Sequence, residues 1–146
     1  MRALSFYKRW LRHRQIAFDT SFLIPLLEDV AQKEGVVTRI FEVAERRSIL
    51  LLTSTVTLLE VLVHPYRHKA IDKVNLYYGY LVQAPHVELV ALSTEIADCA
   101  ARLRAEYGFK TPDAIQLGTA ITKEATLFLT RDREFRKQKE IEIGLI

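Results

Sequence analysis

The sequence predicts a three-layer α/β/α protein, in which a central parallel sheet of four to five strands lies between two layers of helices. Short apolar runs alternate along the chain with segments whose apolar residues recur at three-to-four spacing, which is typical of strands that alternate with helices. Several apolar runs contain no polar alternation, as expected for parallel strands that are covered on both faces. The chain has 146 residues, the usual size of one domain.

Five segments are expected to form the strands of this sheet. They cover residues 16–19, 49–53, 87–92, 125–130 and 141–145. Each is short and is bounded by turn or capping residues, which is the usual appearance of strands in an alternating α/β chain. We expect the fifth strand, which contains Ile141, Ile143 and Leu145, to lie at an edge of the sheet.

Caps and helix breakers set the expected ends of the helices. The expected helices cover residues 21–31, 36–47 and 55–63, a longer segment that ends at Pro85, and two segments that begin after Ser93 and at Thr111. Gly35 is expected to separate the first two helices, and Pro65 is expected to end the third. The expected capping residues are Thr20 or Ser21, Ser54 or Thr55, Ser93 or Thr94, and Thr111.

Positive charge is concentrated at the N-terminus. The formal net charge is +3, yet residues 1–15 hold five Arg or Lys residues and no acid, so the remainder carries a net charge of −2. We therefore expect a basic N-terminal extension over residues 1–15 and a single domain over 16–146. A basic arm suits nucleic acid or an acidic protein partner, and a solvated helix or tail is an equal alternative.

Composition also limits the cellular setting of the chain. Cys99 is the one cysteine, so no intramolecular disulfide can form, which fits a cytoplasmic protein. No apolar run approaches the roughly 20 residues that a membrane span needs. We expect no membrane association.

Four acids are expected to meet at one edge of the sheet. Asp19 follows the first predicted strand, Asp132 follows the fourth, Asp113 begins a helix, and Glu60 lies in an apolar run on the helix after the second strand. In an open parallel sheet, such positions converge at the carboxyl ends of the strands, where ligands bind. Singly, each Asp could serve only to stabilise a helix start. Together, four carboxylates require a cation, and oxygen ligands suit Mg²⁺ or Mn²⁺.

Other kinds of site are less consistent with the sequence. His64 and His68 are four residues apart, but Pro65 lies between them and no third zinc ligand is evident. No Gly-rich phosphate loop is present. A phosphate-accepting receiver domain needs an Asp at the end of its third strand, where this chain has Ala91-Leu92-Ser93.

The stretches that carry these acids resemble the successive motifs of the PIN-domain nucleases, and most closely those of the small prokaryotic VapC-type toxins. The stretches are 19–24, which begins with Asp19-Thr20-Ser21, 57–60, which ends in Glu60, 111–120, which begins with Thr111-Pro112-Asp113, and 130–135, which begins with Thr130-Arg131-Asp132. The resemblance implies a Mg²⁺- or Mn²⁺-dependent ribonuclease. It implies Asp19, Glu60, Asp113 and Asp132 as catalytic and metal-binding residues. It also implies that Ser21 and Thr130 are supporting polar residues.

The resemblance further implies partners. Toxins of this type are usually homodimers that a small antitoxin holds inactive, and RNA is the substrate. Candidates for RNA contact are Arg131, Arg133, Arg136 and Lys137, in the segment around Asp132. Two alternatives stay open. One is a protein of the same fold that binds without catalysis in an RNA-processing assembly. The other is a nuclease that cuts DNA, since nothing in the sequence reads the 2′-hydroxyl.

Overall fold

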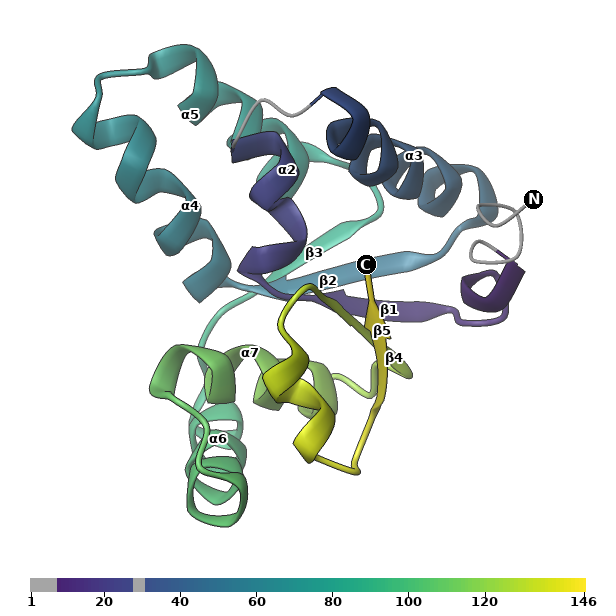
Figure 1. The fold of residues 1–146 in the computed structure, drawn as a ribbon, viewed down its shortest axis with the longest axis vertical. Coiled ribbons are helices and arrows are strands. Elements are labelled where there is room, and N and C mark those ends of the chain that lie inside the picture. The colour runs from purple at the N-terminus through teal and green to yellow at the C-terminus, as the bar shows by residue number, and fades with distance from the viewer. Residues whose placement is uncertain (1–7, 28–30) are drawn as a thin grey trace.

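A five-stranded parallel sheet in the order β3-β2-β1-β4-β5 forms the centre of the molecule (Figure 1). The computed structural model describes residues 8–27 and 31–146, with residues 26, 27 and 31–34 described by their backbone only. The strands are β1 (Gln15–Phe18), β2 (Leu50–Ser54), β3 (Val87–Val90), β4 (Leu127–Thr130) and β5 (Glu142–Leu145). Every pair of neighbouring strands is parallel, which confirms the predicted fold class and places the predicted fifth strand at an edge.

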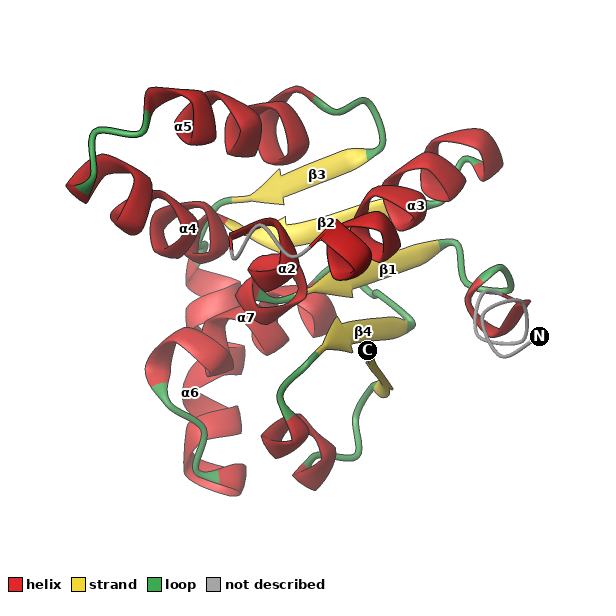
Figure 2. Ribbon diagram, turned by 45° about the horizontal axis from the view of Figure 1, so that its top comes forward, coloured by secondary structure: helices red, strands yellow, loops and turns green. Residues whose placement is uncertain are grey.

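Helices cover both faces of the sheet (Figure 2). One face carries the short turn η1 (Thr20–Leu23), α2 (Ile24–Leu27), α3 (Ala31–Arg47), α4 (Thr55–Arg67), α5 (Ile71–Tyr78) and the π-helical turn η2 (Gly79–Gln83). The other face carries α6 (Thr94–Tyr107) and α7 (Thr111–Thr122). A third short turn, η3 (Arg133–Lys137), connects β4 to β5.

Two apolar cores result, one on each face of the sheet. Successive residues of a strand point to opposite faces. Ile16 and Phe18 of β1 therefore enter the core beneath α3 to α5, whereas Ala17 between them enters the core beneath α6 and α7. The central strands β1 and β4 are buried throughout except for Gln15, as the uninterrupted apolar runs predict. This rigid, doubly covered sheet is the platform on which the carboxyl ends of β1 and β4 are held.

Two predicted helix ends are wrong. Helix α3 runs through Gly35, because one exposed glycine costs a helix only about 1 kcal/mol, which burial of Val37, Ile40 and Ala44 outweighs. Helix α4 runs through Pro65 to Arg67. Proline removes only one hydrogen bond there, and its ring is buried.

The capping predictions have mixed outcomes. Ser54 and Ser93 accept hydrogen bonds from the backbone N–H groups of Val56 and Ile96, as predicted. Lys110 rather than Thr111 precedes the first turn of α7, so that prediction is wrong by one residue. The lysine side chain makes no capping bond.

The start of the described chain is attached to the edge of the sheet. Trp10 is buried against the core under α3, and the Arg9 and Arg12 guanidinium groups pair with the Glu142 carboxylate of β5. His13 Nδ1 lies 2.9 Å from Thr126 Oγ1. Among the described helices, none has both the length and the apolar character needed to cross a membrane.

Candidate active site

Asp19 lies at the carboxyl end of β1 and is buried, with only 3% of its surface exposed. Its Oδ1 accepts hydrogen bonds from Ser21 Oγ at 2.6 Å and from the Phe22 N–H at 3.2 Å. Asp19 therefore caps η1, and the prediction that Thr20 or Ser21 does so is wrong. Because η1 begins directly after Asp19, the Asp19 carboxylate is in position to accept from a backbone N–H group of the first turn.

The pKa of Asp19 reflects two opposing influences. Burial, the larger one, raises this pKa, and the net result of all influences is a pKa of about 6 instead of 3.8. Hydrogen bonds from Ser21, Thr130 and the Phe22 backbone lower the pKa, and the nearby Asp113 raises it further. Asp19 is thus a buried carboxylate at the end of the central strand β1, and no cation of the described residues is among the groups that shift its pKa.

Ser21 and Thr130 connect the ends of two neighbouring strands around Asp19. Thr130 Oγ1 donates to Asp19 Oδ2 at 2.8 Å and lies 3.1 Å from Ser21 Oγ. Ser21 Oγ in turn accepts the Arg131 N–H at 2.8 Å, and Thr130 Oγ1 accepts the Asp132 N–H at 3.0 Å. These two hydroxyls hold both the Asp19 carboxylate and the chain that follows β4.

Glu60 is half-buried on α4, between the exposed Leu59 and the buried Val61. Burial raises its pKa most, a hydrogen bond with the Thr20 side chain lowers it, and Asp113 raises it. Thr20 belongs to η1, directly after Asp19. The second acid is therefore in contact with the turn that the first acid caps.

Asp113 interacts electrostatically with each of the other three acids. Asp113 lies in the first turn of α7 and is half-buried. Burial raises its pKa most, and Asp132 raises it further, whereas Lys110 and Lys137 lower it. Asp113 itself raises the pKa values of Asp19 and Glu60.

The hydrogen bond that the Asp132 carboxylate accepts comes from a residue close to it in sequence. It precedes η3, and its Oδ1 accepts the Glu134 N–H at 2.9 Å. This is the helix-start role that the sequence offers as an alternative for an Asp in such a position. Its effect on Asp113 nevertheless includes it in the same acidic cluster.

The donor chemistry of this cluster fits a hard divalent cation. Every side chain in it offers carboxylate or hydroxyl oxygen, and mutual repulsion raises carboxyl pKa values, which a cation would reverse. In the described part of the chain, however, no three acidic, His or Cys side chains are close enough to hold one metal ion. The ring centroids of His64, on α4, and His68, which directly follows this helix, lie 4.1 Å apart, so Pro65 does not separate the two rings. Among the described residues, no third ligand joins them.

Two lysines lie near the acidic cluster, and three arginines follow β4 in and before η3. Lys137 Nζ lies 3.2 Å from Glu134 Oε2 and 4.5 Å from the centre of the Phe109 ring. Arg133 and Arg136 are exposed, and Arg131 is half-buried. Lys110, which the sequence analysis does not single out, joins them through its effect on Asp113. Its position immediately before Thr111-Pro112-Asp113 is the signal that could have identified it.

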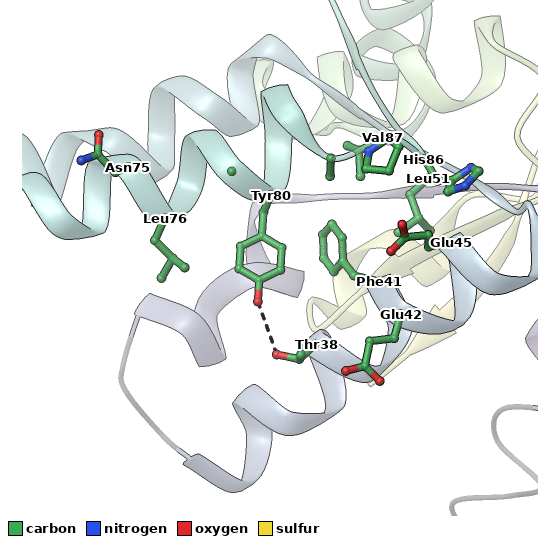
Figure 3. A pocket seen from close by; sticks show the side chains of 13 residues that line it. Thr38, Phe41, Glu42, Glu45, Leu51, Asn75, Leu76, Tyr80, His86 and Val87 are labelled. Atoms are coloured by element: carbon green, nitrogen blue, oxygen red, sulfur yellow. Dashed lines mark hydrogen bonds between the residues drawn. The ribbon is translucent and has the colours of Figure 1, made fainter.

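A second concave feature lies apart from the acids. A groove of about 530 Å³ runs between α3, η2 and the start of β3 (Figure 3). Its apolar wall includes Phe41 and Tyr80, whose ring centroids are 4.8 Å apart, and the exposed Glu42 and Glu45 lie on its α3 side. None of the four acids lines this groove.

Several solved structures have a fold similar to that of this chain. The fold is similar to that of a chain from a toxin–antitoxin complex of Klebsiella pneumoniae, with a TM-score of 0.61 and 23% identity over 86% of this chain and 94% of that one. A chain of VapBC2 from Rickettsia felis, bound to a DNA fragment from the promoter, gives a TM-score of 0.68 and 12% identity over 90% and 98%. DNA-bound VapBC from Salmonella typhimurium gives 0.64 and 19% over 89% and 96%.

Sequence comparison identifies the family. No curated protein matches the chain. Residues 16–141, however, match the PIN domain, and this range contains all four acids together with Ser21 and Thr130. The matched range extends from β1 to the residue before β5, so it includes four of the five strands. The chain therefore belongs to the PIN domain family.

Proposed function

We propose that this chain is a metal-dependent endoribonuclease that hydrolyses RNA phosphodiester bonds, and that it is the toxin of a toxin–antitoxin pair. Asp19, Glu60, Asp113 and Asp132 are its catalytic and metal-binding residues. The observation that carries the proposal is the electrostatic connection of Asp113 with the other three acids at the carboxyl edge of the sheet. One buried and three half-buried carboxylates in such a cluster are costly for the fold, and function at this edge accounts for them.

The residues of the site have distinct tasks in this proposal. The four acids hold Mg²⁺ or Mn²⁺, which when bound lowers the pKa of water and neutralises charge on the phosphate. Ser21 and Thr130 fix the direction in which the Asp19 carboxylate points, because each donates a hydrogen bond to it. Asp113 and Asp132 offer oxygen atoms from the side of α7 and η3.

RNA approaches over the cations beside the cluster. Arg131, Arg133, Arg136 and Lys137 contact its phosphates in this proposal, and Lys110 joins them. Phosphate contacts of this kind position a nucleic acid without reading its sequence. The basic extension over residues 1–15 adds to the same attraction.

Cleavage of a mixed RNA pool tests the proposal. The purified chain is incubated with Mg²⁺, Mn²⁺ or EDTA, beside Asp113→Asn and the matched control Asp98→Asn, an exposed residue of α6. We expect metal-dependent cleavage by the wild type and the control, and a loss of at least about 100-fold in rate for Asp113→Asn. Single-stranded DNA in a parallel reaction separates a ribonuclease from a DNA-cutting enzyme.

One observation favours a second candidate function. The described acidic side chains do not converge tightly enough for three of them to hold a metal ion. A binding module of an RNA-processing assembly needs no such convergence. Inertness of the folded wild type in every metal, combined with retained RNA binding, would favour this alternative over catalysis.

We also propose that a small antitoxin regulates the enzyme and binds in the groove between α3 and η2 (Figure 3). The apolar wall suits an apolar segment, and Glu42 and Glu45 suit basic side chains beside it. The double reversal Glu42→Arg/Glu45→Arg is expected to weaken antitoxin affinity at least about tenfold without changing the cleavage rate of the free enzyme. Equal affinity for both proteins, measured by calorimetry, would place the antitoxin elsewhere.

We further propose that the chain acts in the cytoplasm as a homodimer. Leu59, Val63 and Tyr66 are exposed on one face of α4, which leaves an apolar stripe without a partner in one copy of the chain. Light scattering during gel filtration is expected to give twice the monomer mass for the wild type and the monomer mass for Val63→Arg. A monomeric wild type at micromolar concentration would contradict the dimer.

A further inference from the structure

Gln116 is a polar residue on the buried face of α7, one turn after Asp113, and only 3% of its surface is exposed. Its amide nitrogen donates two hydrogen bonds, one to Thr20 Oγ1 at 2.6 Å and one to Thr57 Oγ1 at 3.1 Å. Thr20 lies directly after Asp19, and Thr57 lies one turn before Glu60. The amide thus joins the elements that carry three of the four acids.

The direction of each hydrogen bond in this network follows from proton counting. Thr53 Oγ1 lies 2.7 Å from the Phe18 carbonyl, which can only accept, so Thr53 donates its single proton there. Thr53 must therefore accept from Thr57 Oγ1, which is 2.8 Å away. Thr57 has then used its own proton and can only accept from Gln116. The nitrogen of the amide, not its oxygen, must face the two hydroxyls.

The same counting determines what Thr20 can do. Thr20 Oγ1 accepts a hydrogen bond from the Gln116 amide, so its own hydroxyl proton remains available for a different acceptor. The acceptor at hand is the Glu60 carboxylate, since α4 packs against η1 and hydrogen bonding with the Thr20 side chain lowers the pKa of Glu60. A continuous, directed chain of hydrogen bonds therefore connects the Phe18 carbonyl of β1, through Gln116, with an acid of the site.

We propose that Gln116 is a positioning residue of the acidic site, whose amide holds the Thr20 hydroxyl as a hydrogen-bond donor to Glu60 and so fixes the orientation of this carboxylate for the metal. The proposal rests on the proposed function, since it assigns Glu60 to the metal. Groups that orient metal ligands matter strongly, because substituting them typically weakens metal affinity by 10–100-fold.

The arrangement of the hydrogen bonds around Gln116 fits a role in orienting Glu60 better than a purely structural role. It contains no exposed member that water could replace, apart from the half-buried Thr20 at the site itself. Each donated proton of the network has one acceptor. Without the Gln116 amide, the Thr20 hydroxyl loses the group that holds it in place and is free to rotate away from Glu60. In this proposal Gln116 acts on the Glu60 carboxylate through Thr20, whereas its second hydrogen bond, to Thr57, connects α7 with α4.

Calorimetric titration of the full chain with Mn²⁺ tests the proposal independently of cleavage. The variants are Gln116→Met, which keeps the length of the side chain but removes its hydrogen bonds, Thr20→Val, and the double variant. The control is Thr119→Val, a buried residue of the same helix whose hydroxyl donates to the Ile115 carbonyl and to no other described group. We expect each single variant to raise the Mn²⁺ dissociation constant about tenfold. The control is expected to change it less than about twofold.

The double variant separates positioning from general stability. Because Gln116 acts through Thr20, Gln116→Met is expected to have little further effect when Thr20 is already Val. In cleavage assays, saturating Mn²⁺ is expected to restore the rate of Gln116→Met to near that of the wild type. A structural role would not produce this coupling or this rescue. Thr20→Val, at a half-buried position, keeps the test informative where Gln116→Met does not fold.

Two outcomes would overturn the proposal in distinguishable ways. A folded Gln116→Met that binds Mn²⁺ as the wild type does, or effects that add fully in the double variant, would remove the role of Gln116 and leave the nuclease intact. A wild type that neither binds Mn²⁺ nor cleaves RNA would remove the proposed function and this role together.

Discussion

Thr130 Oγ1 donates a 2.8 Å hydrogen bond to Asp19 Oδ2 and thereby joins the carboxyl ends of two neighbouring parallel strands. The contact is fully buried and spans 111 residues of sequence. It gives one oxygen of the most buried acid a fixed donor, while Ser21 serves the other oxygen. The stability of this edge of the sheet and the orientation of Asp19 therefore depend on the same hydroxyl group.

Thr130→Val, which keeps the shape of the side chain, is expected to lower the free energy of unfolding by about 1–3 kcal/mol, because a buried carboxylate oxygen loses its donor. Urea unfolding at pH 8 measures this change. Thr38→Val is the matched control, since the one contact of the Thr38 hydroxyl within the described residues is with Tyr80 Oη, at 3.5 Å. We expect this control to lower the free energy of unfolding by about 0.5 kcal/mol or less. Equal losses in the two variants would show that the hydroxyl of Thr130 contributes nothing special.

The raised pKa of Asp19 predicts how stability depends on pH. The folded state holds the Asp19 proton up to about pH 6, whereas the unfolded chain releases it near 3.8. Between these values the folded state binds more protons, so the free energy of unfolding falls as the pH rises. A difference of two between the folded and unfolded pKa values corresponds to about 3 kcal/mol.

Asp19→Asn removes this titration. We expect the variant to match the wild type in stability near pH 4 and to exceed it by about 2–3 kcal/mol at pH 8, in EDTA. Urea unfolding from pH 4 to pH 8 measures the difference, with Asp98→Asn as an exposed control that is expected to follow the wild type. A difference between Asp19→Asn and the wild type that stays constant with pH would contradict the assigned cause.

Much of the fold was predictable from the sequence because the signals are local. The apolar runs of β1, β2 and β4 and the caps Ser54 and Ser93 lie within a few residues of what they specify. Gly35 and Pro65 were misleading because their local cost is about 1 to 3 kcal/mol, and burial of the surrounding helix faces, which involves distant residues, exceeds it.

The candidate site was less predictable than the fold. The order of strands and helices places the four acids at one edge, which a sequence can indicate. It cannot indicate that Asp19, rather than Thr20 or Ser21, caps η1, since the carboxylate also needs Thr130 from 111 residues away. Gln116 stands out in the sequence only as a polar residue on an apolar helix face. Its partners come from η1 and α4.

Two glycines in helices are expected to respond oppositely to substitution. A Cβ added at Gly35 meets nothing within 4 Å, so Gly35→Ala is expected to raise the free energy of unfolding by about 1 kcal/mol. A Cβ at Gly118 lies 3.3 Å from the Ala100 backbone nitrogen, because α6 and α7 approach closely there. Gly118→Val is therefore expected to lower this free energy by about 1–3 kcal/mol, or to prevent folding.

Thermal and urea unfolding of both variants check this pair. Gly118→Ala separates size from the mere presence of a side chain, and it is expected to lie between the wild type and Gly118→Val. If Gly118→Val were as stable as the wild type, the close approach of α6 and α7 would be unnecessary for the fold.

The exposed arginines of η3 are expected to attract RNA. Within the described residues, the guanidinium groups of Arg133 and Arg136 have no hydrogen bond or ion pair, and they follow Asp132 by one and four residues. Each phosphate contact to a single strand contributes about 0.7 to the dependence of log affinity on log salt concentration. Arg133→Ala/Arg136→Ala is thus expected to reduce that slope by about 1.4 and to weaken RNA binding for all sequences alike.

Fluorescence anisotropy with a labelled single-stranded RNA, from 50 to 300 mM salt, measures this slope. The binding assays use EDTA so that no cleavage occurs. Lys123→Ala is the control, because Lys123 is paired with Glu88 at 2.8 Å and follows α7 at the end opposite to Asp113, so its removal is expected to leave the slope unchanged. An unchanged slope in the double variant would mean that RNA reaches the acids from another side, where Lys110 on the α7 side of Asp113 becomes the first residue to substitute.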